Sequence, residues 1–273
     1  MTLGPLQLSE ETARLPPRLL VSVRNVDEAR AALDGGAAIL DLKEPRHGPL
    51  GRVSLHVGKE VMAFLSGPSS ADGSPRTGDS LRHRVTLSAA LGEVHDEDRP
   101  RNWKPVPGIS LYKLGLSRCA GNGRWKSALD GWLEWLKVSG PGPSLVAVAY
   151  ADDSIARAPQ PREVLEYAIG RRLPYFLMDT FDKRQGSLRA WRSDGELKAL
   201  VDIAHRGGVR VALAGCLRAE DFEALAPLGP DVLAVRSAAC QGGDRLQQVD
   251  AIRVASLVAK LNRSRPRTPH LSW

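Results

Sequence analysis

The chain has 273 residues, of which 42% are hydrophobic and 25% are charged, a composition typical of a globular protein. No apolar run approaches the roughly 20 residues that a membrane-spanning helix needs, and the N-terminus lacks the apolar core of a secretory signal. The net charge of +7 suits nucleic acid or small anionic substrates, but the basic residues are dispersed, which argues against specific nucleic-acid binding.

The cysteines and histidines predict neither a disulfide framework nor a metal site. Cys119, Cys216 and Cys240 form no CxxC pair, which favours reduced thiols and a cytoplasmic location. The six histidines are scattered and form no HxH or HExxH motif. We therefore predict no metal and no other cofactor.

Short apolar segments alternate with amphipathic segments along almost the whole chain. The apolar segments, rich in β-forming residues, predict strands at 18–23, 38–43, 84–91, 111–116, 144–150, 175–180, 210–215 and 232–237. The segments between them predict helices at 26–33, 54–65, 123–140, 161–170, 195–208, 219–229 and 245–261. Nearly continuous apolar strands are typical of a parallel sheet that is covered on both faces.

These β/α units predict a single TIM (β/α)8-barrel domain over residues 18–261, between tails at 1–17 and 262–273. An open doubly wound sheet is the alternative, although no GxGxxG fingerprint follows the first strand. The third unit is irregular, because the segments 67–79 and 94–108 are rich in Gly, Pro and polar residues. We expect both segments to be loops.

Charged residues follow several of the predicted strands at the end where a barrel carries its chemistry. Asp41 and Lys43 end the second strand, and because side chains alternate along a strand, both should point into the barrel mouth. Lys113 lies in the fourth strand, while Asp179 ends the sixth and Lys183 follows it. We therefore expect these five side chains to meet at the mouth.

The chain strongly prefers arginine for ordinary positive charge, with 29 Arg and 9 Lys, yet Lys43, Lys113 and Lys183 lie at core strands. A buried lysine can lose its proton and form a Schiff base, whereas arginine keeps its charge. Asp41 and Asp179 would then orient the amines and transfer protons. The alternative is that Asp41–Lys43 and Asp179–Lys183 are ion pairs without a chemical role, although isolated interior pairs are costly.

The last two strands predict a phosphate site. The loops after strands seven and eight of TIM barrels often bind phosphate through backbone N–H groups. Gly215 and Cys216 end the seventh strand, and Arg236 and Ser237 end the eighth. The glycine would allow close approach to the backbone, and the last two residues would add a charge and a hydroxyl, although Gly215 could equally serve a simple tight turn.

Two blocks carry a resemblance to a known family. The DxKxPxxGxLG block runs from Asp41 to Gly51, and the MDTxxK block runs from Met178 to Lys183. Together with LLVSV, YKLGL, LAGCL and VRSAAC, they resemble (5-formylfuran-3-yl)methyl phosphate synthases, which make the furan precursor of methanofuran-type one-carbon carriers. The resemblance spans nearly every strand end between about 18 and 260.

This resemblance implies a class I aldolase-like barrel that condenses two molecules of glyceraldehyde 3-phosphate with loss of phosphate and water. By residue, it implies Lys43 as the Schiff-base lysine, with Asp41, Lys113, Asp179 and Lys183 as catalytic companions. The alternatives are an aldolase for another aldehyde phosphate and a non-catalytic basic barrel that binds nucleic acid or a protein partner. A homo-oligomer also stays open, because a tryptophan pair on the 123–140 helix suits either barrel packing or a subunit contact.

Overall fold

The computed structural model describes residues 16–67, 85–95, 105–121, 123–138 and 142–263. The predicted N-terminal tail lies almost wholly outside these residues, as do most of the predicted C-terminal tail and most of the loops at 67–79 and 94–108. In the part that is described, no helix is both long enough and apolar enough to span a membrane.

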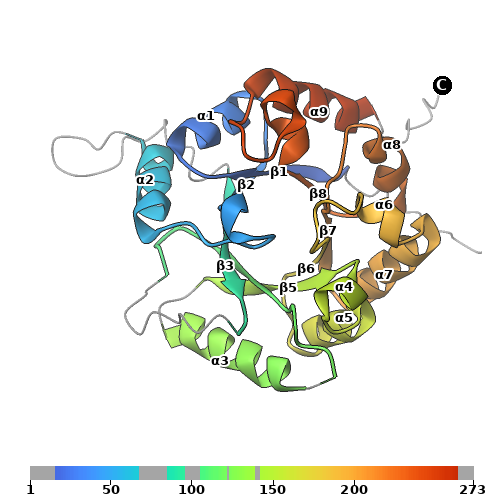
Figure 1. The fold of residues 1–273 in the computed structure, drawn as a ribbon. Coiled ribbons are helices and arrows are strands. Elements are labelled where there is room, and N and C mark those ends of the chain that lie inside the picture. Colours follow the sequence, from blue (N-terminus) through green and yellow to red (C-terminus); the bar gives the residue numbers. More distant parts are fainter. Residues whose placement is uncertain (1–15, 68–84, 96–104, 122, 139–141, 264–273) are drawn as a thin grey trace, which may run out of the picture.

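Eight parallel strands close into a barrel in the order in which they occur in the chain. The strands are β1 (Arg18–Val23), β2 (Ile39–Leu42), β3 (Thr86–Glu93), β4 (Leu111–Gly115), β5 (Ser144–Tyr150), β6 (Tyr175–Asp179), β7 (Arg210–Leu213) and β8 (Val232–Val235). The pairing of β1 with β8 closes the ring and excludes the open-sheet alternative. Figure 1 shows the strands as an inner ring surrounded by helices, which confirms the predicted TIM barrel.

Helices surround the barrel, and most of them follow the predicted amphipathic segments, whereas two short helices, Asp153–Ala156 and Leu188–Trp191, were not predicted. They are α1 (Val26–Asp34), α2 (Leu55–Ser66), α3 (Arg124–Val138), α4 (Asp153–Ala156), α5 (Pro161–Gly170), α6 (Leu188–Trp191), α7 (Asp194–Arg206), α8 (Asp221–Leu225) and α9 (Ala251–Arg263). Short 3-10 turns lie in the connections between these elements: η1 (Pro45–His47), η3 (Ala226–Leu228), η4 (Ser237–Ala239) and η5 (Gln241–Gly243).

The last helix begins later than the sequence predicts. Its predicted start was residue 245, but α9 starts at Ala251, because the Asp250 carboxylate accepts hydrogen bonds from the N–H groups of Ile252 and Arg253. The segment 245–250 is instead part of the loop between β8 and α9. This loop reaches the barrel mouth and contributes to the site described below.

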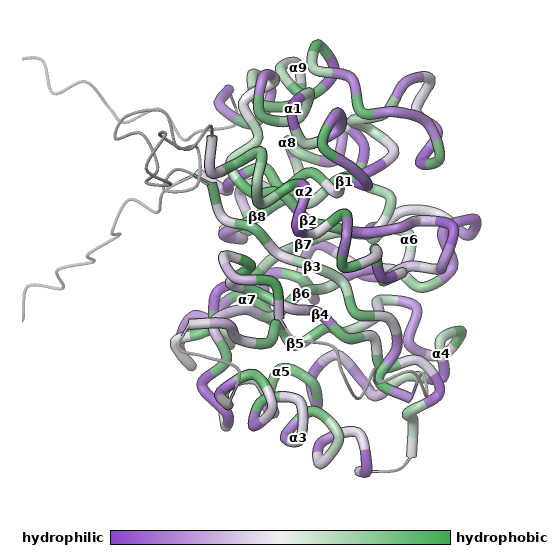
Figure 2. The backbone as a smooth tube through the Cα atoms, turned by 90° about the vertical axis from the view of Figure 1, so that its left-hand side faces the viewer, coloured by the Kyte–Doolittle hydropathy of each residue, from purple (hydrophilic) through white to green (hydrophobic). Residues whose placement is uncertain are grey.

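Apolar side chains fill the barrel in two layers. One cluster lies between the strands and the helices, where α3 contributes the buried Trp132. A second cluster fills the inside of the barrel with Leu20, Ile39, Leu50, Ala90, Val146, Val148, Tyr175, Leu177, Ala212, Ala214, Val232 and Ala234. The side view in Figure 2 shows the strands largely in hydrophobic colours. Polar residues inside this barrel are therefore exceptions, and most of them lie together.

Candidate active site

A cavity at the barrel mouth contains the polar exceptions. It has a volume of about 820 Å³ including its open side, and the five charged residues predicted at the strand ends all line it. We call these five side chains the lysine cluster: Asp41, Lys43, Lys113, Asp179 and Lys183. Four of them are buried and Lys183 is mostly buried, so their charges lie in a poorly hydrated environment.

The Asp41 carboxylate is held by neighbouring strands. The strand register places Ser22 of β1 and Ser88 of β3 on either side of Asp41. The Ser22 hydroxyl donates to Oδ2 at 3.1 Å and the Ser88 hydroxyl donates to Oδ1 at 2.8 Å. The Lys113 ammonium also forms an ion pair with Asp41. The partner of Asp41 is therefore Lys113, rather than the Lys43 of the sequence-based alternative.

Asp179 and Lys183 form the second ion pair of the cluster. Lys183 Nζ lies 2.5 Å from Asp179 Oδ1, and the N–H of Thr180 donates to the same oxygen at 2.8 Å. Burial alone would raise the pKa of the Asp179 carboxyl, but the ammonium groups of Lys183 and Lys43 and these hydrogen bonds hold it below its usual range. The carboxylate is therefore ionised at neutral pH.

Lys43 differs from the other two lysines. Its backbone N–H donates to Val23 at 3.0 Å and so extends the β1–β2 pairing, which carries the side chain to the mouth. Among the described residues, its ammonium has no hydrogen-bond or ion-pair partner. Burial lowers the pKa of Lys43 to about 8; the carboxylates of Asp179 and Asp41 oppose this shift, whereas the ammonium groups of Lys183 and Lys113 strengthen it.

The loop after β2 forms one wall of the cavity. Glu44 and Gly51 close this loop with a backbone hydrogen bond of 2.8 Å, and any larger residue at 51 would collide with the Glu44 carbonyl. Leu50, just before the closing residue, lines the cavity and packs on the inner barrel cluster. This explains in physical terms why a Pro/Gly-rich turn directly follows Lys43.

The predicted phosphate residues Gly215, Cys216 and Ser237 also line the cavity. Gly215 has a φ of +101°, and a Cβ at this position would lie 2.8 Å from the Thr180 side chain, so only glycine fits. Within the described part of the chain, the backbone N–H groups of Gly215, Cys216 and Ser237 have no acceptor. These N–H groups are free to bind an anion.

Arg236 lines the cavity but has a different task from the one predicted. Its guanidinium donates to both carboxylate oxygens of the buried Glu28 and to the carbonyl oxygens of Ser22, Arg245 and Gln247. These contacts use all five N–H bonds that an arginine side chain has. The prediction that Arg236 contacts phosphate directly is therefore wrong, because all five of its N–H bonds already have protein acceptors.

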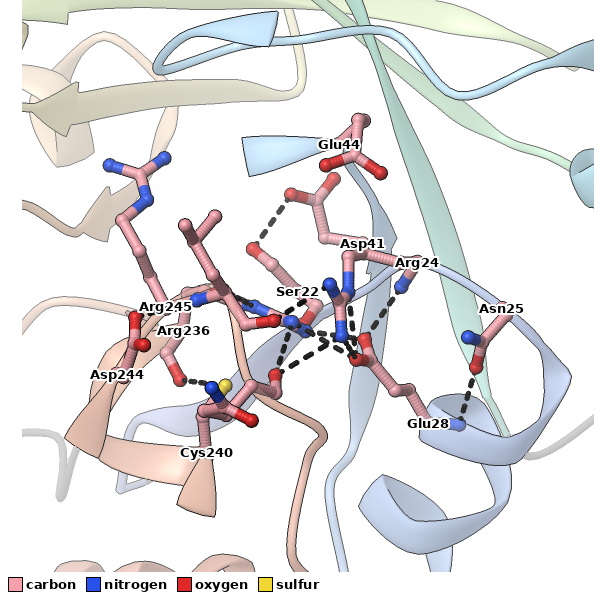
Figure 3. Close-up of polar contacts among 12 residues, drawn as sticks. Ser22, Arg24, Asn25, Glu28, Asp41, Glu44, Arg236, Cys240, Asp244 and Arg245 are labelled. Atoms are coloured by element: carbon pink, nitrogen blue, oxygen red, sulfur yellow. Dashed lines mark hydrogen bonds and ion pairs between the residues drawn. The ribbon is translucent and has the colours of Figure 1, made fainter. Parts of the chain in front are cut away.

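Arg24 completes this second cluster of buried charge, which we call the Glu28 clamp: Arg24, Glu28 and Arg236 (Figure 3). Burial would raise the pKa of the Glu28 carboxyl, but hydrogen bonds from Arg236 and Arg24 hold it below its usual range. The clamp adjoins the lysine cluster, since the Ser22 carbonyl accepts from Arg236 while the Ser22 hydroxyl donates to Asp41.

The sequence did not indicate two residues of this site. Ser22 lies within an apolar strand, and only the β1–β2 register shows that it adjoins Asp41. Arg245 lies in the segment predicted as helix, yet its side chain lines the cavity. As for metal binding, no three His, Cys, Asp or Glu side chains gather as candidate ligands in the residues described.

Comparisons with known proteins identify the family of this chain. A family model described as 4-HFC-P synthase matches residues 19–258, which is most of the chain. The chain belongs to the 4-HFC-P synthase family. A (5-formylfuran-3-yl)methyl phosphate synthase of Methanopyrus kandleri is 34% identical over 90% of this chain and 97% of that protein. A protein of Methylorubrum extorquens, named as a putative synthase of the same kind, is 29% identical over 92% of this chain and 94% of that protein.

Solved structures show the same fold at greater distance. KGPDC from Streptococcus mutans, in complex with D-R5P, covers 90% of this chain and 98% of its own, with a TM-score of 0.55 and 12% identity. This likeness supports the barrel architecture of the family member described here.

Proposed function

We propose that this family member condenses two molecules of glyceraldehyde 3-phosphate to (5-formylfuran-3-yl)methyl phosphate through a Schiff base on Lys43. The observation that carries the proposal is the buried Lys43 ammonium, which has no partner among the described residues and whose pKa is lowered to about 8, between two lysine–aspartate pairs. An amine with this pKa is partly neutral near pH 7, and only the neutral amine attacks an aldehyde.

The first step joins Lys43 Nζ to the aldehyde carbon of one substrate molecule, with loss of water. The resulting imine makes the adjacent carbon acidic, so that loss of a proton yields an enamine, whose nucleophilic carbon can form the carbon–carbon bond to the second molecule. The surrounding positive charge of Lys113 and Lys183 disfavours a protonated Lys43 before reaction.

The two flanking ion pairs supply proton transfer. Asp179 and Lys183 lie 2.5 Å apart and both line the cavity, so either can exchange a proton with a substrate bound to Lys43. Asp41 is fixed by Ser22, Ser88 and Lys113, which leaves Lys113 as the group on that side with protons to donate. The two pairs thus flank the imine from different strands.

Loss of phosphate requires stabilisation of the departing anion. Gly215, Cys216 and Ser237 line the same cavity as the lysines, and their backbone N–H groups, which have no acceptor among the described residues, can donate hydrogen bonds to that anion. Two triose phosphates contain six carbons and two phosphates, whereas the product contains six carbons and one phosphate. The balance is therefore the loss of one phosphate and two waters.

The names of the relatives support this product, which would be a furan building block of a methanofuran-type one-carbon carrier. The decisive experiment incubates the purified chain with glyceraldehyde 3-phosphate alone and follows the furan chromophore and released phosphate. Borohydride is then added in a parallel sample, and the modified peptide is mapped by mass spectrometry.

We expect both a furan phosphate and a reduced adduct on Lys43. An adduct on another lysine would overturn the role of Lys43, and imine formation with no furan would favour an aldolase for another aldehyde phosphate. Neither imine nor turnover would favour the non-catalytic barrel.

A further inference from the structure

Arg245 is a cationic side chain at the barrel mouth whose hydrogen-bonding capacity is largely unused. It lies in the loop between β8 and α9 and lines the cavity that contains the lysine cluster. Its Nε is buried without a hydrogen-bond partner. Among the described residues, the guanidinium has one contact at the limit of hydrogen bonding, 3.5 Å from its Nη2 to the Gly48 carbonyl of the loop after β2. A buried N–H without an acceptor is costly unless a ligand completes it.

The Glu28 clamp fixes the backbone that carries Arg245. Arg236 Nε donates to the Arg245 carbonyl at 2.9 Å, and Arg24 donates to the next two carbonyls, of Leu246 at 2.9 Å and Gln247 at 3.2 Å. Figure 3 shows the Arg245 side chain directed away from Glu28, while the side chain of Arg236 is directed toward it. The two arginines of this loop therefore differ in how their N–H donors are used. Every N–H of Arg236 donates to a protein acceptor, whereas Arg245 has a fixed backbone and an Nε–H without an acceptor among the described residues.

We infer that Arg245 binds the phosphate of an aldehyde phosphate substrate, at a position separate from the N–H groups of Gly215, Cys216 and Ser237. A guanidinium presents two parallel N–H groups that match phosphate oxygens, so the buried Nε and an adjacent terminal nitrogen form a ready bidentate donor. The contact with Gly48 places this donor on the β2 side of the mouth, whereas the N–H groups belong to the loops after β7 and β8.

This inference rests on the proposed function, because condensation of two triose phosphates requires two phosphates to be held near one lysine. One anion position at the loops after β7 and β8 would accommodate only one of them. Arg245 supplies the second position, and the Glu28 clamp acts as its support. The loop that the sequence predicted as helix is therefore the loop that orients this phosphate ligand.

The test compares Arg245→Ala and Arg245→Lys with the intact chain. Arg46→Ala is the matched control, since Arg46 lies exposed on the β2 loop at the same end of the barrel and does not line the cavity. For each protein, borohydride trapping is measured against the concentration of glyceraldehyde 3-phosphate and, separately, of unphosphorylated glyceraldehyde. Binding of inorganic phosphate is measured by calorimetry, which needs no turnover.

We expect Arg245→Ala to raise the half-saturating concentration of glyceraldehyde 3-phosphate by about 10- to 100-fold, as for loss of a charge-assisted hydrogen-bonded pair. Trapping with unphosphorylated glyceraldehyde should stay within about twofold, and Arg245→Lys should lie between Arg245→Ala and the intact chain. Arg46→Ala should match the intact chain in every assay.

An unchanged half-saturating concentration in Arg245→Ala would overturn the inference while leaving the proposed function intact. If the intact chain traps no aldehyde, the proposed function fails, and the phosphate titration alone decides on Arg245. A phosphate affinity about tenfold weaker in Arg245→Ala would then support the anion site, and an equal affinity would overturn it. An equal loss of affinity in Arg46→Ala would also overturn the inference, because the effect would then reflect the net positive charge around the barrel mouth.

Discussion

The lysine cluster and the Glu28 clamp are two groups of buried charge that share Ser22 as a neighbour yet are built in opposite ways. In the clamp, one carboxylate accepts from two guanidiniums, and every N–H of Arg236 has a protein acceptor. In the lysine cluster, two carboxylates are each paired with one amine, and the third amine, Lys43, has no partner among the described residues.

The difference lies in which groups can change their charge. Arginine keeps its proton at every pH at which proteins are folded, so the clamp has one charge state and suits a structural role. A buried lysine can lose its proton, and the pKa of Lys43 is already lowered to about 8. The Glu28 clamp therefore positions a loop, whereas the lysine cluster retains an amine, Lys43, that can react.

Removal of Lys43 should have the largest effect on activity and should not weaken the fold. We expect Lys43→Met to lower turnover by about 10⁴-fold or more, because the other two lysines that line the cavity in the described part of the chain, Lys113 and Lys183, are each paired with a carboxylate. Because the folded pKa of Lys43 lies below its unfolded value of about 10.4, holding the charged amine in the folded state costs stability, and this cost grows as the pH falls from about 10.4 and is complete below about pH 8. Lys43→Met should therefore be as stable at pH 7 as the intact chain, or more stable by up to about 3 kcal/mol.

Turnover assays and urea unfolding measure the two quantities separately. Lys198→Met is the control, since Lys198 pairs with Asp202 on the surface of α7 and should leave activity and stability nearly unchanged. If Lys43→Met were inactive because it is less stable than the intact chain, Lys43 would have a structural role like that of the Glu28 clamp, and the contrast between the two clusters would fail.

Removal of the clamp carboxylate should have the opposite profile. Glu28→Gln leaves the buried guanidinium of Arg236 and the partly exposed guanidinium of Arg24 without their counter-charge, and we expect the free energy of unfolding to fall by about 3 to 5 kcal/mol in urea titrations. Glu166→Gln, which removes the carboxylate of an exposed pair with Arg162, should cost less than about 0.5 kcal/mol.

The pH dependence gives a second test of the clamp. The folded pKa of Glu28 lies below its unfolded value of about 4.3, so its contribution is complete above that pH and is lost as the pH falls through the folded pKa. The stability difference between the intact chain and Glu28→Gln should therefore shrink in acid. A difference that stays constant down to pH 3 would show that the carboxylate charge contributes nothing.

The sequence predicted the lysine cluster better than the clamp for a physical reason. Asp41, Lys113 and Asp179 lie in strands whose alternation and ends can be located from the chain alone, and a barrel brings strand ends together. The choice of partners was wrong in one case, because Asp41 pairs with Lys113 across strands and the register that allows this is not visible in the sequence.

The clamp could not be predicted because its parts are far apart in the chain. Glu28 and Arg236 are separated by 208 residues, and nothing local to Arg236 distinguishes a saturated guanidinium from a free one. The same clamp explains the misplaced start of α9, since the carbonyls of Arg245, Leu246 and Gln247 accept from Arg24 and Arg236 in place of forming helical hydrogen bonds. Tertiary contacts here override a helical pattern.

The smallest effect we predict concerns the tuning of Lys43 by its neighbour Lys183. The rate of imine trapping in the intact chain should rise with pH through about 8 as Lys43 becomes neutral. Lys183→Met removes a positive charge that lowers the pKa of Lys43 and also frees Asp179, whose negative charge raises it. Both changes act in the same direction, so the midpoint of the trapping profile should move upward by about one pH unit.

Lys183→Arg separates this electrostatic effect from proton transfer. An arginine keeps the positive charge beside Asp179, so the trapping midpoint should stay near that of the intact chain, but it cannot release a proton and turnover should fall. If Lys183→Met and Lys183→Arg move the midpoint equally, or if the midpoint of Lys183→Met moves down, Lys183 does not tune Lys43 by its charge. The lowered pKa of Lys43 would then rest on its burial, without a contribution from the charge of Lys183, and the Asp179–Lys183 pair would serve only to hold and transfer protons.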